Sequence, residues 1–179
     1  MKIRNMARCA MLTALLCVCA WIGFPFGDVS ITLQTFALFL TLGLLGGKYG
    51  SLVCLLYLLL GTVGLPVFSG FRGGLGTLLG ATGGYILGFL AAAVVYWLMT
   101  GLLGSRFWIR LVASLLGLIV CYGFGTLWYA LVWARGGMAL GLILWKCVVP
   151  YLVPDLIKLG LALAATEKLK RFILPSSGA

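Results

Sequence analysis

The chain has 179 residues, of which 63% are hydrophobic and only 9% are charged, and its mean hydropathy is +1.19. Soluble domains carry about 25% charged residues, so this composition excludes a soluble globular protein and predicts an integral membrane protein. The net charge of +10 comes from basic residues scattered at the ends of apolar stretches, which indicates membrane topology rather than nucleic-acid binding.

The length allows about six membrane-spanning helices of roughly 20 residues, joined by short connections. The apolar stretches predict an all-α bundle, a single membrane domain over residues 1–179, with spans at residues 7–24, 31–47, 51–65, 82–103, 111–133 and 153–171. The first stretch follows a charged segment but meets no convincing small-residue cleavage site before Phe24. We therefore expect it to remain as the first helix, followed by a loop around Pro25, Gly27 and Asp28.

Two segments do not have the pattern of a spanning helix. Residues 67–80 are too rich in glycine. Residues 138–151 are interrupted by Lys146 and Pro150, which predicts an interfacial or re-entrant segment.

Basic residues predict the orientation of the bundle in the membrane. With the N-terminus inside, the inner ends of the spans carry Lys2, Arg4, Arg8, Lys48, Arg106, Arg110, Lys168, Lys170 and Arg171. The outer ends carry Arg72 and Arg135, with Lys146 added if its segment lies outside. Because cytoplasmic loops are enriched in lysine and arginine, we expect both termini in the cytoplasm.

An acid and a base three residues apart, Asp155 and Lys158, are the main candidates for a functional site. The whole chain has three acidic residues and no histidine. A charged side chain within a membrane costs roughly 2.5–3.5 kcal/mol on insertion scales, so it indicates function by default. Residues i and i+3 share a helix face, so both can point into one cavity. Pro154 suits a first helical turn, so we expect the pair near the start and outer end of the last span.

Polar or small residues at other span positions are weaker candidates. Gln34 and Thr35 lie at the outer start of the second span, at the expected depth of Asp155. Their side chains would either form hydrogen bonds between helices or contact a ligand. Ala7, Ala10 and Ala14 form a small-residue surface on the first helix. That surface can pack internally or face a partner helix, and spacing alone favours internal packing.

The densest glycine cluster, residues 71–85, has two compatible interpretations. Gly76, Gly80, Gly84 and Gly88 recur every four residues, as in closely packed helices. Alternatively, a loop of bare backbone would let a ligand contact main-chain N–H and C=O groups.

Motifs for catalysis and metal binding are missing from the sequence. It has no GxxxxGK[ST] loop, no His/Glu metal cluster and no acid–base pair suited to hydrolysis. Its six cysteines have no zinc-site spacing and mostly lie in apolar runs. We expect a binding protein, not an enzyme, with no metal, no cofactor and no ATPase motif of its own. A small channel or membrane enzyme with a structural Asp155–Lys158 pair remains the alternative.

Four motifs carry a resemblance to a known family. They are Ile-Thr-Leu-Gln-Thr-Phe at 31–36, Gly-Leu-Pro at 64–66, Gly-Gly-Tyr at 83–85 and Pro-Asp-Leu-Ile-Lys at 154–158. In this order, over residues 8–170, the chain resembles the BioY family, the biotin-specific S components of energy-coupling factor (ECF) transporters. It departs from the family at Ala81, where proline is usual, and at Pro154, where glycine is frequent; Thr82 remains a reasonable N-cap for the following helix.

The resemblance implies an ECF S-component-like six-helix bundle in the cell membrane that captures biotin from outside. It implies as partners biotin, the lipid bilayer, a transmembrane coupling subunit and two ATPase subunits, but no nucleic acid. Ala10 and Ala14 match the family surface that contacts the coupling subunit. An S component for another small vitamin is the alternative within this class.

Biotin has a ureido ring with two N–H donors and one carbonyl, an apolar thiophane ring and a carboxylate tail. An ionised Asp155 would accept from a ureido N–H, and Lys158 would donate to either the ureido carbonyl or the carboxylate. Tyr85 would cover the ring, and Arg72 is a further candidate for the carboxylate. The expected ligand-binding residues are Gln34, Thr35, Gly73, Gly74, Gly84, Tyr85, Asp155 and Lys158.

Overall fold

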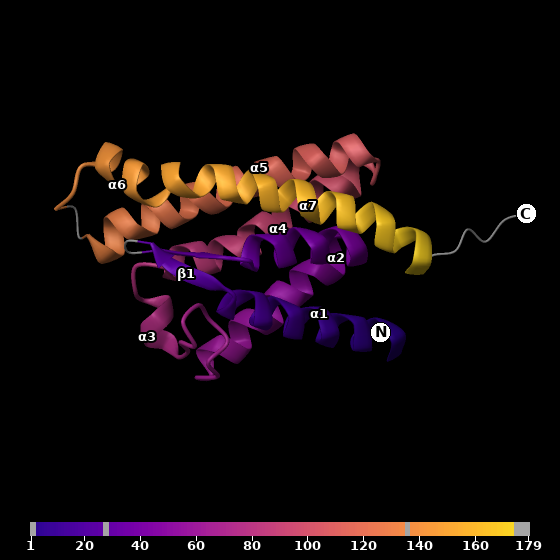
Figure 1. Cartoon of the computed structure of the whole chain (residues 1–179), viewed down its shortest axis with the longest axis horizontal. Helices are drawn as coiled ribbons and strands as arrows, with labels where there is room; N and C mark the ends of the chain where they lie inside the picture. Colours follow the sequence, from indigo (N-terminus) through magenta and orange to yellow (C-terminus); the bar gives the residue numbers. More distant parts are fainter. Residues whose placement is uncertain (1–2, 27–28, 135–136, 174–179) are drawn as a thin grey trace, which may run out of the picture.

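The computed structural model describes residues 3–26, 29–134 and 137–173 (Figure 1). The expectations for Lys2, for Gly27 and Asp28 in the first loop, and for Arg135 fall outside the described residues, as does the side chain of Arg171.

Helices account for most of the described chain. In order, the elements are α1 (Ile3–Trp21), β1 (Gly23–Phe26), β2 (Val29–Thr32), α2 (Gln34–Thr62), α3 (Leu75–Leu78), α4 (Gly83–Leu103), α5 (Phe107–Trp128), the π-helical turn η1 (Tyr129–Trp133), α6 (Leu140–Cys147) and α7 (Val149–Ile173). Within the described ranges, five helices are long and apolar enough to cross a membrane: α1, α2, α4, α5 extended by η1, and α7. The prediction of an all-helical membrane bundle is confirmed.

Helix α2 contains both the second and the third predicted spans. Gly46 interrupts it with φ +77° and ψ 170°, a left-handed conformation that glycine adopts without a Cβ clash. A Cβ placed on Gly50 would lie 3.2 Å from the Cα of Leu42. Eight residues of straight helix would separate these positions by about 12 Å, so residues 34–45 and 47–62 fold back on one another. The turn lies where the Gly46–Gly47–Lys48 sequence predicted it.

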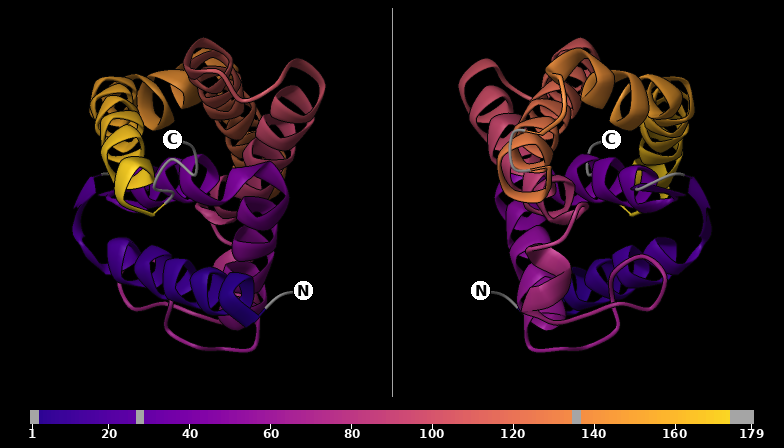
Figure 2. Two further views of the ribbon diagram at one scale, coloured as in Figure 1. Left: turned by 90° about the vertical axis from the view of Figure 1, so that its right-hand side faces the viewer. Right: turned by 90° about the vertical axis from the view of Figure 1, so that its left-hand side faces the viewer.

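The two ends of the bundle differ in character. The start of α1 and the end of α7 lie at one end, and the β-hairpin, α3 and α6 lie at the other (Figure 1). We call these the termini end and the hairpin end. Helix α2 packs against α1, α4 and α7, while α5 packs on α4 (Figure 2). A helix that is apolar on all sides is buried among other helices, which accounts for the central position of α2.

The connection between α1 and α2 is a β-hairpin rather than a simple loop. Phe24 pairs with Ile31 and Gly23 with Thr32 in antiparallel register. The predicted first span therefore extended too far, and the second began too early. The β-branched residues of the Val-Ser-Ile-Thr segment at 29–32 favour a strand over a helix.

Helix α7 begins at Val149, earlier than predicted, so the expectation that Pro154 marks the helix start is wrong. Pro150 occupies the first turn, and Pro154 lies inside the helix. Pro154 has no N–H to donate to the carbonyl of residue 150, and its ring crowds that carbonyl, yet the helix continues through it to Ile173. Asp155 therefore lies in the second helical turn.

The two segments without a predicted span contain short helices. Residues 138–151 form α6, a break at Val148 and the start of α7. Residues 67–80 contain the single turn α3 and an isolated bridge between Phe68 and Arg72. Thr82 occupies the N-cap position of α4, but its hydroxyl caps no backbone N–H in the described chain.

Only the second half of the four-residue glycine repeat is a helix-packing repeat. A Cβ on Gly84 would lie 2.2 Å from the Cβ of Trp128, and one on Gly88 would lie 3.0 Å from the carbonyl of Cys121, so α4 and α5 are in close contact there. Gly76 belongs to α3, where a Cβ would meet no described atom within 4 Å. The intervening loop breaks the helical periodicity that the sequence suggested.

Candidate ligand-binding site

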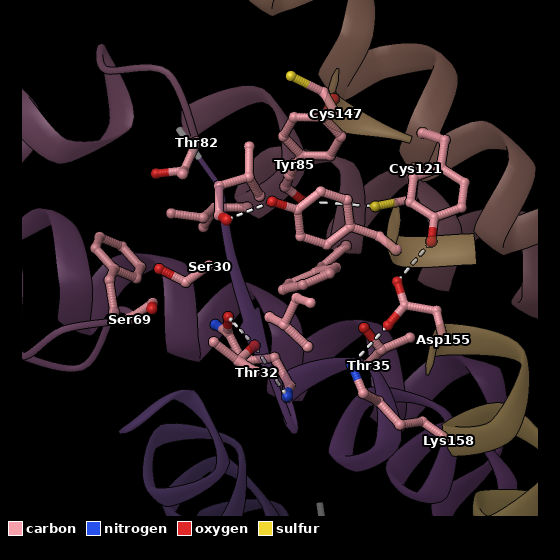
Figure 3. A pocket seen from close by; sticks show the side chains of 18 of the residues that line it. Ser30, Thr32, Thr35, Ser69, Thr82, Tyr85, Cys121, Cys147, Asp155 and Lys158 are labelled. Carbon is pink, nitrogen blue, oxygen red and sulfur yellow. Dashed lines mark hydrogen bonds and ion pairs between the residues drawn. The ribbon is translucent and has the colours of Figure 1, made fainter. Parts of the chain in front are cut away.

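A cavity opens between the elements of the hairpin end (Figure 3). The space between its walls, counted out through its open mouth, is about 780 Å³. Strand β2, the starts of α2 and α4, the loop before α3, and the inner faces of α5, α6 and α7 form its wall. Residues far apart in the sequence thus surround one space.

Asp155 and Lys158 both line this cavity, which confirms that they share one helix face. Lys158 Nζ donates to Asp155 Oδ1 at 2.8 Å, and the side chains are only 11% and 10% exposed. A buried charge is costly unless it is paired and hydrogen-bonded, and each of these ions meets that condition through the other. The pair still offers carboxylate lone pairs and further ammonium N–H groups to a ligand.

Tyr122 on α5 completes this group, although no local sequence pattern marks it as a site residue. Its hydroxyl donates to Asp155 Oδ2 at 2.6 Å, and its side chain lines the cavity. A phenol buried in an apolar span needs a hydrogen-bond partner. Because the chain has only three acidic residues, their scarcity is the sequence signal that indicates Asp155 as the acceptor.

Gln34 and Thr35 also line the cavity, at the start of α2. Figure 3 shows Thr35 beside Asp155 and Lys158. The Gln34 carboxamide is already engaged: its Oε1 accepts from Thr32 Oγ1 at 2.9 Å, and its Nε2 donates to the Tyr57 hydroxyl at 2.6 Å. Of the two interpretations of Gln34, bonding within the protein is therefore realised in this structure.

Tyr85 belongs to the wall, but three predicted glycines lie outside the wall that the described residues form. A Cβ on Gly73 would lie 2.2 Å from the carbonyl oxygen of Leu65, so Gly73 permits a close backbone approach within the loop. The Gly74 N–H donates to the Gly61 carbonyl at 2.7 Å. Gly84 faces α5, as described above. Their bare backbone serves turns and packing, a distinction that spacing alone did not make.

The remaining wall combines apolar and aromatic side chains with several hydroxyl groups. Its apolar members include Phe68, Ile86, Phe89 and Leu118. Ser30 and Ser69 lie on the side opposite Asp155 and Lys158 in Figure 3. The loop that contributes Ser69 also contributes the exposed Arg72 to the wall. The cavity thus has an acid–base pair on one side and the cation of Arg72 in the loop on the other.

Ala10 and Ala14 are exposed on α1. The buried stripe of that helix runs through Cys9, Thr13 and Leu16, so the alanines lie on its other side. Internal packing, which spacing alone favoured, is therefore the wrong interpretation of this surface. It is open to lipid or to a partner.

Comparisons with known proteins agree in their assignment. The sequence pattern of the BioY family matches residues 1–174. The chain is 39% identical to a biotin transporter BioY of Thermotoga maritima, covering 94% of this chain and 96% of that protein. It is 38% identical to a probable biotin transporter BioY of Pyrococcus horikoshii, covering 95% and 98%. A crystal structure of the S-component for biotin from an ECF-type ABC transporter superposes with a TM-score of 0.85 and 28% identity, over 95% of this chain and 92% of that one.

Proposed function

The chain belongs to the BioY family, and from this membership we propose that it is the biotin-binding S component of an ECF-type importer. It is a multi-pass membrane protein that binds biotin in the cavity of the hairpin end. The observation that carries the proposal is a buried acid–base pair, Asp155 and Lys158, on one side of a cavity whose wall also presents apolar, aromatic and hydroxyl-bearing side chains.

The chemistry of the pair matches the ureido ring. A carboxylate that accepts and an ammonium that donates lie side by side, as an N–H donor and a carbonyl acceptor do in a ureido group. Asp155 receives a ureido N–H, and Lys158 donates to the ureido carbonyl. In a site without water, a ligand that lacks a matching polar group leaves a buried protein group without a hydrogen-bond partner. Such a group costs about 1–3 kcal/mol, so the site rejects these ligands. The rings of Tyr85 and Phe89 cover the thiophane.

The carboxylate tail of biotin points to the loop side of the cavity. A second carboxylate beside Asp155 would be repelled, whereas Arg72 and Ser69 supply a positive charge and a hydroxyl on the other side. Arg72 is exposed, so the tail stays partly hydrated and its ion pair adds little affinity.

The orientation and the partners follow from charge and exposure. The described basic residues of the termini end include Arg4, Lys48, Arg106 and Lys168, which supports a cytoplasmic location for both termini. The cavity then opens to the outside, where biotin is captured. The chain hydrolyses no ATP itself: it assembles through Ala10 and Ala14 with a transmembrane coupling subunit, which joins it to two ATPase subunits.

The proposal is tested by purifying the chain in detergent and identifying any small molecule released on denaturation by mass spectrometry. We expect biotin. Titration calorimetry of the ligand-free protein should then show tight binding of biotin and none of other vitamins of similar size. Binding of a different vitamin, with biotin ignored, would overturn the ligand assignment.

A further inference from the structure

Two segments of the hairpin end cover the cavity. The β-hairpin formed by strands β1 and β2 contributes Ser30 and Thr32 to the wall, and the loop at residues 66–74 contributes Phe68 and Arg72. A ligand held against both segments would be released more readily when they move away from it. How they are held is therefore relevant to the rate of ligand release.

A chain of buried hydrogen bonds joins the two segments through one side chain behind the wall. Thr32 Oγ1 donates to Gln34 Oε1, and Gln34 Nε2 donates to the hydroxyl of Tyr57 at 2.6 Å. The Tyr57 hydroxyl in turn donates to the carbonyl of Val67 in the loop at 3.1 Å. The ring of Tyr57 also packs edge-on against Phe68, with centroids 5.4 Å apart.

Other contacts hold each segment separately. Trp21 Nε1 donates to the carbonyl of Pro66 at 2.8 Å, and the Trp21 ring stacks on Phe71 with centroids 5.0 Å apart. The hairpin has its own anchor, because the hydroxyl of Tyr151 on α7 donates to the carbonyl of Val29. Each of these bonds restrains one segment. Tyr57, in contrast, restrains both.

We propose that Tyr57 is a positioning residue that couples the hairpin to the loop, so that the two covering segments open together and biotin is retained until they do. Tyr57 is 1% exposed and lies behind the cavity wall, so it acts through Gln34 and Val67. In a buried network each bond aligns and strengthens the next, and removing the central hydroxyl leaves groups without partners on both sides. The effect on biotin release rests on the proposed function; the coupling itself does not.

Hydrogen–deuterium exchange of the ligand-free protein in detergent tests the coupling without any ligand. Tyr57→Phe keeps the ring and removes the hydroxyl, so amide exchange should become faster both in residues 23–32 and in residues 66–74. Trp21→Phe should accelerate exchange in the loop alone. The matched control is Tyr49→Phe on the same helix, whose hydroxyl accepts from Asn5 at the termini end. It should change neither segment.

Thr32→Val removes the hydroxyl through which the same series of hydrogen bonds reaches the β-hairpin. This variant keeps the test decisive if Tyr57→Phe folds poorly. It should accelerate exchange in the hairpin while the loop, still bonded to Tyr57, exchanges at the wild-type rate. Faster exchange of only one segment in Tyr57→Phe, or an unchanged hairpin in Thr32→Val, would overturn the coupling.

Release of labelled biotin from Tyr57→Phe should be about tenfold faster than from the wild type, as expected when two hydrogen bonds are lost. Tyr49→Phe should release biotin at the wild-type rate. Coupled exchange with unchanged release would overturn the role in retention. A wild-type protein that binds no biotin would instead refute the proposed function, and the exchange pattern would still decide the coupling.

Discussion

The phenol of Tyr122 on α5 donates a 2.6 Å hydrogen bond to the carboxylate of Asp155 on α7. Lys158 holds the other oxygen of the same carboxylate, so two donors fix its position in the cavity wall. An O–H bond to an ionised group is short and strong, and it keeps the remaining lone pairs of Asp155 directed toward the cavity.

Tyr122→Phe should therefore weaken biotin binding without unfolding the protein. A hydrogen bond to a charged group contributes about 1.5–3 kcal/mol, but Lys158 continues to orient Asp155, so we expect a loss near the lower value, about tenfold in affinity. Calorimetry with detergent-purified protein measures it. Tyr49→Phe, at the termini end, is the matched control. Equal affinity of folded Tyr122→Phe and wild type would show that Asp155 needs no support from α5.

Asp155→Asn preserves the side-chain shape and removes the charge. Because a charge-assisted hydrogen bond is about twice as strong as a neutral one, biotin affinity should fall by about 2–3 kcal/mol. Lys158→Met should be similarly harmful, and the double variant should lose less than the sum of both, since the two residues act as a unit. If the pair is merely structural, calorimetry of the folded variants would give biotin affinities within a few-fold of wild type, and only their melting temperatures would fall.

Arg72→Gln tests the direction of the biotin tail. An exposed ion pair contributes about 0.2–1 kcal/mol, so affinity for biotin should fall by no more than about fivefold. The neutral amide of biotin should bind wild type and Arg72→Gln equally well, because it offers no charge to the guanidinium. A comparable loss for biotin and its amide would place the carboxylate elsewhere.

Ala10→Leu and Ala14→Leu should weaken assembly with the coupling subunit and leave biotin affinity nearly unchanged. Leucine holds two helix backbones apart where alanine lets them meet, and both positions are exposed on α1. Co-purification of the tagged complex measures assembly. Val112→Leu, which enlarges an exposed side chain on α5, is the control. Normal assembly of both alanine variants would exclude this face of α1 as the contact.

Cysteine labelling of intact cells checks the orientation. The six native thiols are buried, so their background should be low. Exposed Arg72, replaced by cysteine, should react with a membrane-impermeant reagent, while cysteines replacing Lys48 and Arg106 at the termini end should react only after the membrane is opened. The reverse pattern would invert the topology.

The sequence by itself determined the membrane character, the approximate spans, the turn at Gly46 and the Asp155–Lys158 pair. These features depend on composition or on residues within a few positions of one another. Hydropathy reports burial in lipid directly, Gly46 can adopt the positive φ that the turn requires, and an i,i+3 pair shares a face in any helix.

The tertiary structure alone decided which residues meet across the cavity. Tyr122 lies 33 positions from Asp155, and Tyr57 lies 23 from Gln34, so no local pattern pairs them. The role of the glycines was also decided by the tertiary structure, because the same glycine-rich loop sequence is compatible with ligand contact and with close backbone packing. Only the position of Leu65 and of α5 shows that Gly73 and Gly84 are used for packing. Interactions between neighbouring residues determine where helices form. Which side chains face the cavity depends instead on how all the helices pack against one another.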